Sequence, residues 1–378
     1  MTGRLRIDLE ALTANYELFR SAAAPGHETG AVVKANGYGV GMTAAALRLH
    51  QAGCRSFFVA TLDEALDLRA ALDQAAAPVT AQSLSPGERS GPATDVYFFE
   101  GVTGADAAAA AAAHDVIPIL NDLAQVALWI PHRERPAALH IDTGMTRLGV
   151  MSDELTAALS MSSSGLEALN LTLLMSHFAC ADDPQHPMNA AQLKRFEALR
   201  ANFPGIRTSL GNSAACLTGP EWQGQLGRPG IGLYGGNPFA EGPSPVRPVA
   251  ALEGQVLQLK EAPAGTTVGY SASRRLDAPA RLAVVGIGYE DGVPWSLSDC
   301  GVMAAGEARC PILGRISMDS TVIDTSAATA LKVGDWVQCY GDLLSVDEVA
   351  AAAGTFAYEL LTRAGNRLAR VPATLGRC

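Results

Sequence analysis

Short apolar runs alternate with helix-like stretches from residue 30 to about residue 235, and this alternation limits the possible folds most strongly. Each run has four to eight residues bounded by Gly, Pro or Asp, as expected for buried parallel strands. The runs are AVVKA (31–35), FFVA (57–60), PVTAQSL (78–84), VYFF (96–99), IPIL (117–120), ALHID (138–142), LTLLMSHF (171–178) and IRTSLG (206–211). Such a series of β-then-α units predicts a parallel barrel.

The stretches between the runs have helical spacing and are rich in Ala and Leu. They lie at 44–52, 61–72, 122–130 and 189–201, and the seven alanines of 107–113 form another strong helix former. A doubly wound open sheet is the rival arrangement, but no GxGxxG turn follows the first run. The sequence therefore favours an N-terminal (β/α)₈ TIM barrel.

The pattern changes at residues 237–249, where thirteen residues contain four prolines. Short β-like runs separated by Gly-rich turns follow, and a helix is expected near 345–366. The β-like runs are VLQLK (256–260), TTVGY (266–270), RLAVVGIGY (281–289), RCPILGRISM (309–318), STVID (320–324) and DWVQCY (335–340). We therefore expect a barrel over 1–240 and a mainly-β C-terminal domain over 241–378.

Charge and cysteine usage limit the classes of partner and compartment. The 28 Lys and Arg against 38 Asp and Glu give a net charge of −10, with no basic run, which argues against a nucleic-acid partner. The N-terminal segment is charged where a signal peptide is apolar, and no apolar run could span a membrane. Seven dispersed cysteines without a C-x-x-C pair or a His cluster favour reduced thiols, a cytoplasmic location and no metal site.

Lys34 follows three apolar residues at the end of the first clear run. In a barrel, the chemistry is found at the C-terminal ends of the strands, so this amine would point into the barrel mouth. A desolvated lysine can fall below its usual pKa of about 10.4 and act as a base or a Schiff-base former. A structural or exposed lysine is the alternative.

Further polar residues stand at later strand ends. His177 is a candidate for catalysis or a hydrogen-bonded core histidine, and Arg147 is a candidate ligand or an ion-pair partner of Asp142. Ser213 begins a small-residue helix and is either its N-cap or part of a phosphate site beside a Gly-Ile pair. Arg228 begins the last Gly-rich segment. One Lys, two Arg, one His, one Ser and a Gly-rich segment at the same barrel face favour the functional interpretation over the structural one.

Several motifs resemble those of bacterial alanine racemases, a family of pyridoxal-phosphate enzymes with a barrel and a C-terminal β-domain. The resemblance covers nearly the whole length and keeps the family order. The motifs are AVVKANGYGVG (31–41), DTGMTRLGV (142–150), SHFACAD (176–182), GNSAA (211–215), RPGIGLYG (228–235), VGYSAS (268–273), GYEDG (288–292), GRISMD (314–319) and YELLTRAGNRLARVP (358–372).

The resemblance assigns a role to each matched residue. Lys34 would carry the pyridoxal 5′-phosphate covalently, and Tyr270 would be the second base. Arg228 would face the ring nitrogen, with His177 between it and Tyr270, and Arg147 would contact the phenolic oxygen. The phosphate would be held by Tyr38, Ser213, the backbone of Gly230 and Ile231, and Tyr358. The substrate carboxylate would be bordered by Met318 and Asp319, and Asp182 would lie near the entrance.

Three positions depart from the family pattern. His140 stands two residues before the DTG motif, where many members have a lysine, carbamylated in some, that orients the following arginine. Thr146 stands where Gly is common, and Pro294-Trp295 stands where Pro-Arg is common. The first departure concerns the position of Arg147, and the other two concern the entrance or local packing.

The resemblance implies interconversion of L-alanine and D-alanine, for cell-wall peptidoglycan or for alanine catabolism. Lys34 and Tyr270 would act on opposite faces of the substrate, in a homodimer with shared active sites. The alternatives are a non-catalytic pyridoxal-phosphate homeostasis protein and a fold-related decarboxylase or lyase. Arg228 argues against decarboxylation, because a guanidinium only donates and so keeps the ring nitrogen unprotonated, whereas related decarboxylases carry an acidic residue there.

Overall fold

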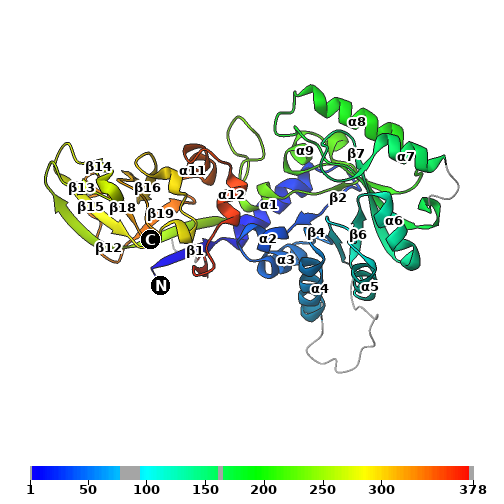
Figure 1. Cartoon of the computed structure of the whole chain (residues 1–378), viewed down its shortest axis with the longest axis horizontal. Helices are drawn as coiled ribbons and strands as arrows, with labels where there is room; N and C mark the ends of the chain where they lie inside the picture. The colour runs from blue at the N-terminus through cyan, green and yellow to red at the C-terminus, as the bar shows by residue number, and fades with distance from the viewer. Residues whose placement is uncertain (1, 77–93, 161–164, 374–378) are drawn as a thin grey trace.

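The computed structural model describes residues 2–76, 94–160 and 165–373. A parallel barrel lies beside a mainly-β domain, and both marked chain ends lie on the β-domain side (Figure 1). Helices α11 and α12 lie between the two parts in this view. The sequence expectation of a TIM barrel followed by a mainly-β domain is confirmed.

The barrel sheet has the strand order β3-β4-β5-β6-β7-β9-β10, all parallel, and β8 adds to β7. The strands are β3 (Ala31–Val32), β4 (Ser56–Val59), β5 (Asp95–Phe98), β6 (Ile117–Leu120), β7 (Pro136–Asp142), β8 (Val150–Met151), β9 (Asn170–Met175) and β10 (Arg207–Ser209). The strand predicted at 78–84 falls outside the described residues.

The barrel closes through the chain on either side of β3. Strand β2 (Glu28–Thr29) pairs with β11 (Leu226–Gly227), and the ladder continues where the Val32 amide donates to the Pro229 carbonyl at 3.0 Å. On its other edge, the Arg228 amide donates to the Gly211 carbonyl at 2.8 Å, just after β10. These bonds exclude the doubly wound open sheet, because they connect the first and last strands of the barrel sheet.

Helices surround the barrel where the sequence predicted them. The alanine run forms α5, in which Ala108, Ala111 and Ala112 are buried, so the small side chains allow close packing on the sheet. The helices of this part are α1 (Leu9–Ala22), α2 (Lys34–Tyr38), α3 (Met42–Gln51), α4 (Leu62–Ala76), α5 (Ala105–Ala113), α6 (Leu123–Trp129), α7 (Ser152–Leu159), α8 (Pro187–Arg200), α9 (Ser213–Thr218) and α10 (Pro220–Gln223).

The sheet of the β-domain has the order β17-β16-β19-β12-β1-β20, and β15 joins β12 to β18. Its strands are β1 (Gly3–Ile7), β12 (Ala250–Ala262), β15 (Ala280–Val285), β16 (Val302–Ala305), β17 (Ala308–Pro311), β18 (Thr321–Asp324), β19 (Trp336–Tyr340) and β20 (Ala369–Pro372). The predicted runs therefore lie in this sheet, apart from the one that contains Tyr270. That run gives only β13 (Thr267–Val268), paired with β14 (Arg274–Arg275), and Tyr270 lies in the turn between them.

Strand β1 belongs to this sheet although it precedes the barrel in sequence. It pairs antiparallel with β12 and parallel with β20. Leu5 and Ile7 are buried, whereas Arg4 and Arg6 lie 2.7 and 3.2 Å from the Glu253 carboxylate. This strand was not predicted from the sequence. The division into a barrel over 1–240 and a C-terminal domain over 241–378 stays a prediction.

The prediction of a single helix near 345–366 is wrong in one respect, because two helices occupy this region. They are α11 (Val346–Ala352) and α12 (Ala357–Thr362). Gly354, with φ at +71°, ends the first helix in the left-handed conformation typical of a C-terminal glycine. This break turns α12 towards the barrel mouth. No helix among the described residues is long and apolar enough to cross a membrane.

Candidate active site

A cavity of about 520 Å³ opens at the C-terminal ends of the barrel strands. It is lined by most of the residues that the sequence singled out, namely Lys34, Tyr38, Arg147, His177, Ser213, Arg228, Gly230, Ile231 and Tyr358, together with His140 and Glu100. Tyr270, Met318 and Asp319 lie in the β-domain and are not among its lining residues. The Tyr270 side chain is 68% exposed.

Lys34 enters the cavity at the start of a left-handed turn. Its Nζ lies 5.5 Å from the Phe99 ring centroid, and burial, reinforced by the Arg147 charge, holds the pKa of Lys34 below its usual value. Ala35, Asn36 and Tyr38 have φ values of 52°, 53° and 53°. This conformation costs about 1–2 kcal/mol for each non-glycine residue. The amide of Met42 donates to Asn36 Oδ1 at 2.9 Å and helps to hold the turn.

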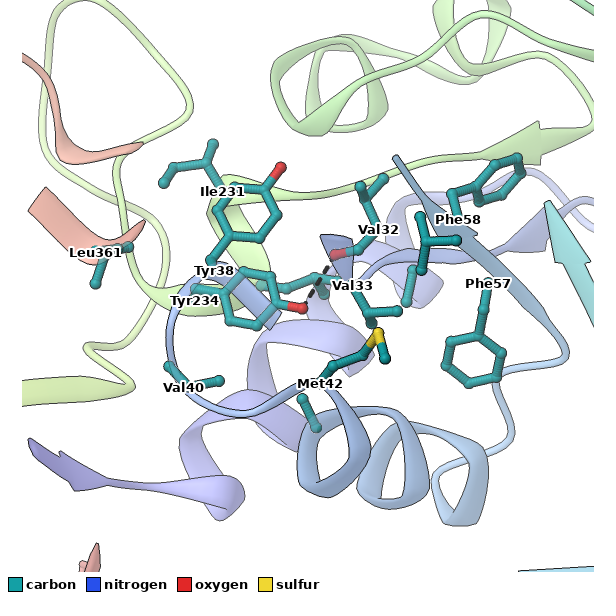
Figure 2. Packing of buried hydrophobic residues seen from close by; sticks show 14 of the residues in the cluster. Val32, Val33, Tyr38, Val40, Met42, Phe57, Phe58, Ile231, Tyr234 and Leu361 are labelled. Carbon is teal, nitrogen blue, oxygen red and sulfur yellow. Dashed lines mark hydrogen bonds between the residues drawn. The ribbon is translucent and has the colours of Figure 1, made fainter. Parts of the chain in front are cut away.

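The left-handed turn returns Tyr38 to the core. Its ring stacks on Tyr234 at 4.6 Å, and the Tyr234 hydroxyl donates to the Val32 carbonyl at 3.0 Å (Figure 2). Tyr358, from α12, lies 6.2 Å from the Tyr38 ring. A Cβ on Gly39 would lie 2.2 Å from the Leu361 carbonyl oxygen, so only glycine allows α12 to approach this closely.

Ser213, Gly230 and the tyrosines form a small polar cradle on one side of the cavity. Asn212 is the N-cap of α9, because its side chain accepts from the Ala215 amide. The Ser213 hydroxyl instead accepts from the Gly230 and Gly232 amides at 2.8 and 3.2 Å, so its own hydrogen is available to a ligand. A Cβ on Gly230 would lie 2.4 Å from the Tyr38 hydroxyl. The cradle suits a phosphate group.

Arg228 lies beneath the cavity and is only 2% exposed. Its Nη2 donates to the Ser176 carbonyl at 2.7 Å and the Leu210 carbonyl at 3.3 Å, and Nη1 donates to the Ser209 hydroxyl. Burial lowers the pKa of Arg228 to about 10, so it remains charged at neutral pH. Its Nε–H has no acceptor among the described residues and is free to donate to a ligand.

His177 and His140 are both neutral and have opposite tautomers. Arg228 Nη2 lies 3.4 Å from His177 Nδ1, and a guanidinium can only donate, so the hydrogen is on Nε2. Burial and the Arg228 charge hold the pKa of His177 well below its usual value. His140 Nδ1 lies 2.9 Å from Asn121 Oδ1 and must donate to it, which leaves Nε2 as an acceptor.

His140 therefore does not supply the negative charge that a carbamylated lysine would. Burial, together with the charges of Arg228 and Arg147, lowers the pKa of His140 to about 3. Arg147 itself is exposed at the rim, and no ion pair to Asp142 is present in the described part of the chain. Asp142 Oδ1 instead accepts from the amides of Gly144 and Met145 at 2.8 and 2.9 Å.

The buried His140 predicts a specific loss of stability in acid. In the unfolded chain it takes up a proton near pH 6.5, whereas in the folded protein it does so only near pH 3. Stability should therefore fall by about 1.4 kcal/mol for each pH unit below 6.5. Urea unfolding gives the free energy of unfolding at pH 7.5 and at pH 5.5. The decrease between these two pH values should be smaller by about 1.4 kcal/mol in His140→Gln than in the parent protein. The exposed His114→Gln is the control, and equal falls in both variants would contradict the prediction.

Sequence reasoning missed two residues that lie behind the cavity lining and hold the strand ends around it. Asn121 directly follows β6, and its Nδ2 donates to the carbonyls of Phe99 and Ile119 at 2.8 and 2.9 Å. The strand-end rule applied to the other strands could have found it. Glu64 lies within α4 and carries no comparable signal in its immediate sequence.

A parallel barrel with a lysine, a polar cradle built on a serine and glycine amides, and a buried arginine at its mouth defines a class of barrel enzymes that use a phosphorylated aldehyde cofactor. Comparisons with known proteins agree with this class. The family model described as alanine racemase, N-terminal domain, matches residues 7–238. The model described as alanine racemase, C-terminal domain, matches residues 249–372. The chain belongs to the alanine racemase family.

Individual relatives match over nearly the full length. A catabolic alanine racemase of Agrobacterium fabrum is 41% identical, over 98% of this chain and 92% of its own. The biosynthetic alanine racemase of the same organism is 36% identical, over 97% and 93%. The crystal structure of the Bartonella henselae alanine racemase with covalently bound pyridoxal phosphate matches with a TM-score of 0.88 and 34% identity, over 98% of this chain and 99% of that chain.

Proposed function

We propose that this protein is a pyridoxal-phosphate-dependent racemase that interconverts L-alanine and D-alanine. The observation that carries the proposal is a lysine of lowered pKa and a buried, donor-only arginine in one cavity, beside the Ser213 and Gly230 cradle. The cradle would hold the phosphate, and Arg228 Nε–H would donate to the ring nitrogen. Because a charged guanidinium can only donate, that nitrogen would stay unprotonated, which would favour racemisation over decarboxylation.

Lys34 is proposed as the base on one face of the substrate. The bound cofactor supplies an electron sink that acidifies the Cα–H of the amino acid. Burial lowers the pKa of Lys34 and so raises the fraction of neutral amine that can accept a proton at Nζ. Arg147 lies at the rim of the cavity and would donate to the phenolic oxygen.

Tyr270 is proposed as the base on the opposite face, supplied by a second copy of the chain in a head-to-tail homodimer. A phenol with a usual pKa near 10 needs help to lose its proton near neutral pH. His177 Nε2–H points away from Arg228 and would donate to the phenolate oxygen. Met318 and Asp319 would border the substrate carboxylate, where the Arg367 guanidinium, 2.6 Å from Asp319 Oδ1, offsets the negative charge.

The direct test is reduction of the cofactor-loaded protein with borohydride, followed by peptide mapping. We expect the reduced cofactor on Lys34, and on none of the other lysines, at 194, 260 and 332. Before reduction, the cofactor-loaded protein should abolish the optical rotation of L-alanine. Label on another lysine would disprove the cofactor assignment. Label on Lys34 without racemisation would instead favour the homeostasis protein.

A further inference from the structure

The carboxylate of Glu64 joins the ends of two neighbouring barrel strands. Glu64 lies in the first turn of α4. Its Oε1 accepts from the amide of Ala35 at 2.6 Å, directly after Lys34, and its Oε2 accepts from the amide of Ala60 at 2.7 Å, directly after β4. Both oxygens are therefore used, one on each strand end. A neutral amide side chain has only one such acceptor.

The Ala35 amide depends on this carboxylate. Strand β3 ends at Val32, and the left-handed turn begins at Ala35, with φ 52° and ψ 51°. The bonds within the turn come from later amides, since Gly37 donates to Val33 and Gly39 donates to Ala35. Without Glu64, the first amide of a strained turn loses its partner, so the backbone that carries Lys34 is free to relax.

The charge of Glu64 also acts on the lysine. The groups near Lys34 are largely cationic or neutral: Arg147 lowers the pKa of Lys34, and His177 is uncharged. Glu64 opposes Arg147 and raises the pKa of Lys34. Glu100, the carboxylate that lines the cavity, is engaged by the amide of Leu62 at 2.7 Å.

We propose that Glu64 is a positioning residue: by bridging the amides of Ala35 and Ala60, it fixes the left-handed turn and so the direction in which Lys34 enters the cavity. The inference rests on the proposed role of Lys34 as the cofactor lysine. On this proposal, the position of Lys34 depends on a carboxylate that does not itself line the cavity.

The test compares Glu64→Gln with Asp63→Asn, which removes an exposed charge from the same helical turn but no amide acceptor. Hydrogen exchange of the full chain loaded with cofactor should be faster at Ala35 or Ala60 by at least about tenfold in Glu64→Gln only. After cofactor removal, the pH midpoint for capture of pyridoxal phosphate by Lys34 should fall by up to about one unit, because a compensating charge is lost.

The Glu64→Asp variant separates the effect of the two amide hydrogen bonds from the effect of the negative charge near Lys34. Its carboxylate is one methylene shorter and cannot reach both amides, so exchange should rise while the capture midpoint stays close to that of the parent. Exchange in Glu64→Gln equal to that in Asp63→Asn, or an unchanged midpoint, would overturn the proposal. If Glu64→Gln does not fold, unchanged exchange in Glu64→Asp overturns it. The amide readout does not depend on turnover, so borohydride label missing from Lys34 would count against the proposed function alone.

Discussion

Replacing Tyr270 with phenylalanine is expected to lower racemisation by about 10²- to 10⁴-fold, the usual effect of losing an acid–base group. The change removes only a hydroxyl from a side chain that is 68% exposed in one chain, so folding and cofactor binding should persist. The measurement is the initial rate of conversion of each enantiomer, with the absorbance of the bound cofactor recorded on the same samples.

Isotope exchange tests which enantiomer of alanine each of the two bases acts on. If Tyr270 acts on L-alanine and Lys34 on D-alanine, the Tyr270→Phe variant should still exchange the Cα hydrogen of D-alanine with deuterated water but should lose exchange from L-alanine. Tyr289→Phe changes another exposed tyrosine of the β-domain and serves as the control. Near-parental racemisation in Tyr270→Phe would exclude the assigned base.

Co-expression of Lys34→Ala and Tyr270→Ala chains should restore activity that neither chain has alone. In a mixed dimer with shared sites, the intact Lys34 of one chain meets the intact Tyr270 of the other, so one of the two sites is whole. With random pairing about half of the dimers are mixed, and about one quarter of all sites should be active. The quarter applies to racemisation per site in the unfractionated mixture, whereas purification through two different tags keeps only mixed dimers, in which about half of the sites should be active.

The exposed apolar side chains support the shared site that this experiment tests. Leu148 and Tyr358 lie at the barrel mouth, and Tyr270, Trp295 and Met318 lie in the β-domain, each between 42% and 68% exposed. Large exposed apolar groups commonly mark protein interfaces. Co-expression of two Tyr270→Ala chains with different tags is the control. If each site were built within one chain, mixing would restore nothing.

The sequence predicted the barrel and most of the cavity because both follow from one regularity. The carboxyl ends of parallel strands meet at one face, so Lys34, His177 and Arg228 had to lie together once the strands were recognised. The resemblance to alanine racemases then supplied residues that no strand-end rule reaches, such as Tyr358 on α12. The helix boundary at Gly354 was missed because the apolar pattern continues through it.

Other features depend on long-range contacts that have no local signal. Ala35 and Tyr38 have no intrinsic preference for positive φ, and only the surrounding hydrogen bonds and packing explain their conformation. The bridge from Glu64 to Ala35 and Ala60 joins residues whose sequence gives no hint of contact. The alternating pattern of GRLRI could indicate a strand, but not that its partners begin at residues 250 and 369.

The pairing of β1 with β20 has a consequence for synthesis on the ribosome. Residues 4–7 leave the ribosome long before their parallel partners at 369–372 are made. The barrel between them can form while β1 still lacks both neighbours and leaves an unpaired strand edge, which promotes association with other chains. If residues 1–240 were expressed alone, β1 would never gain its two neighbouring strands. Leu5 and Ile7 would then lack the sheet that buries them.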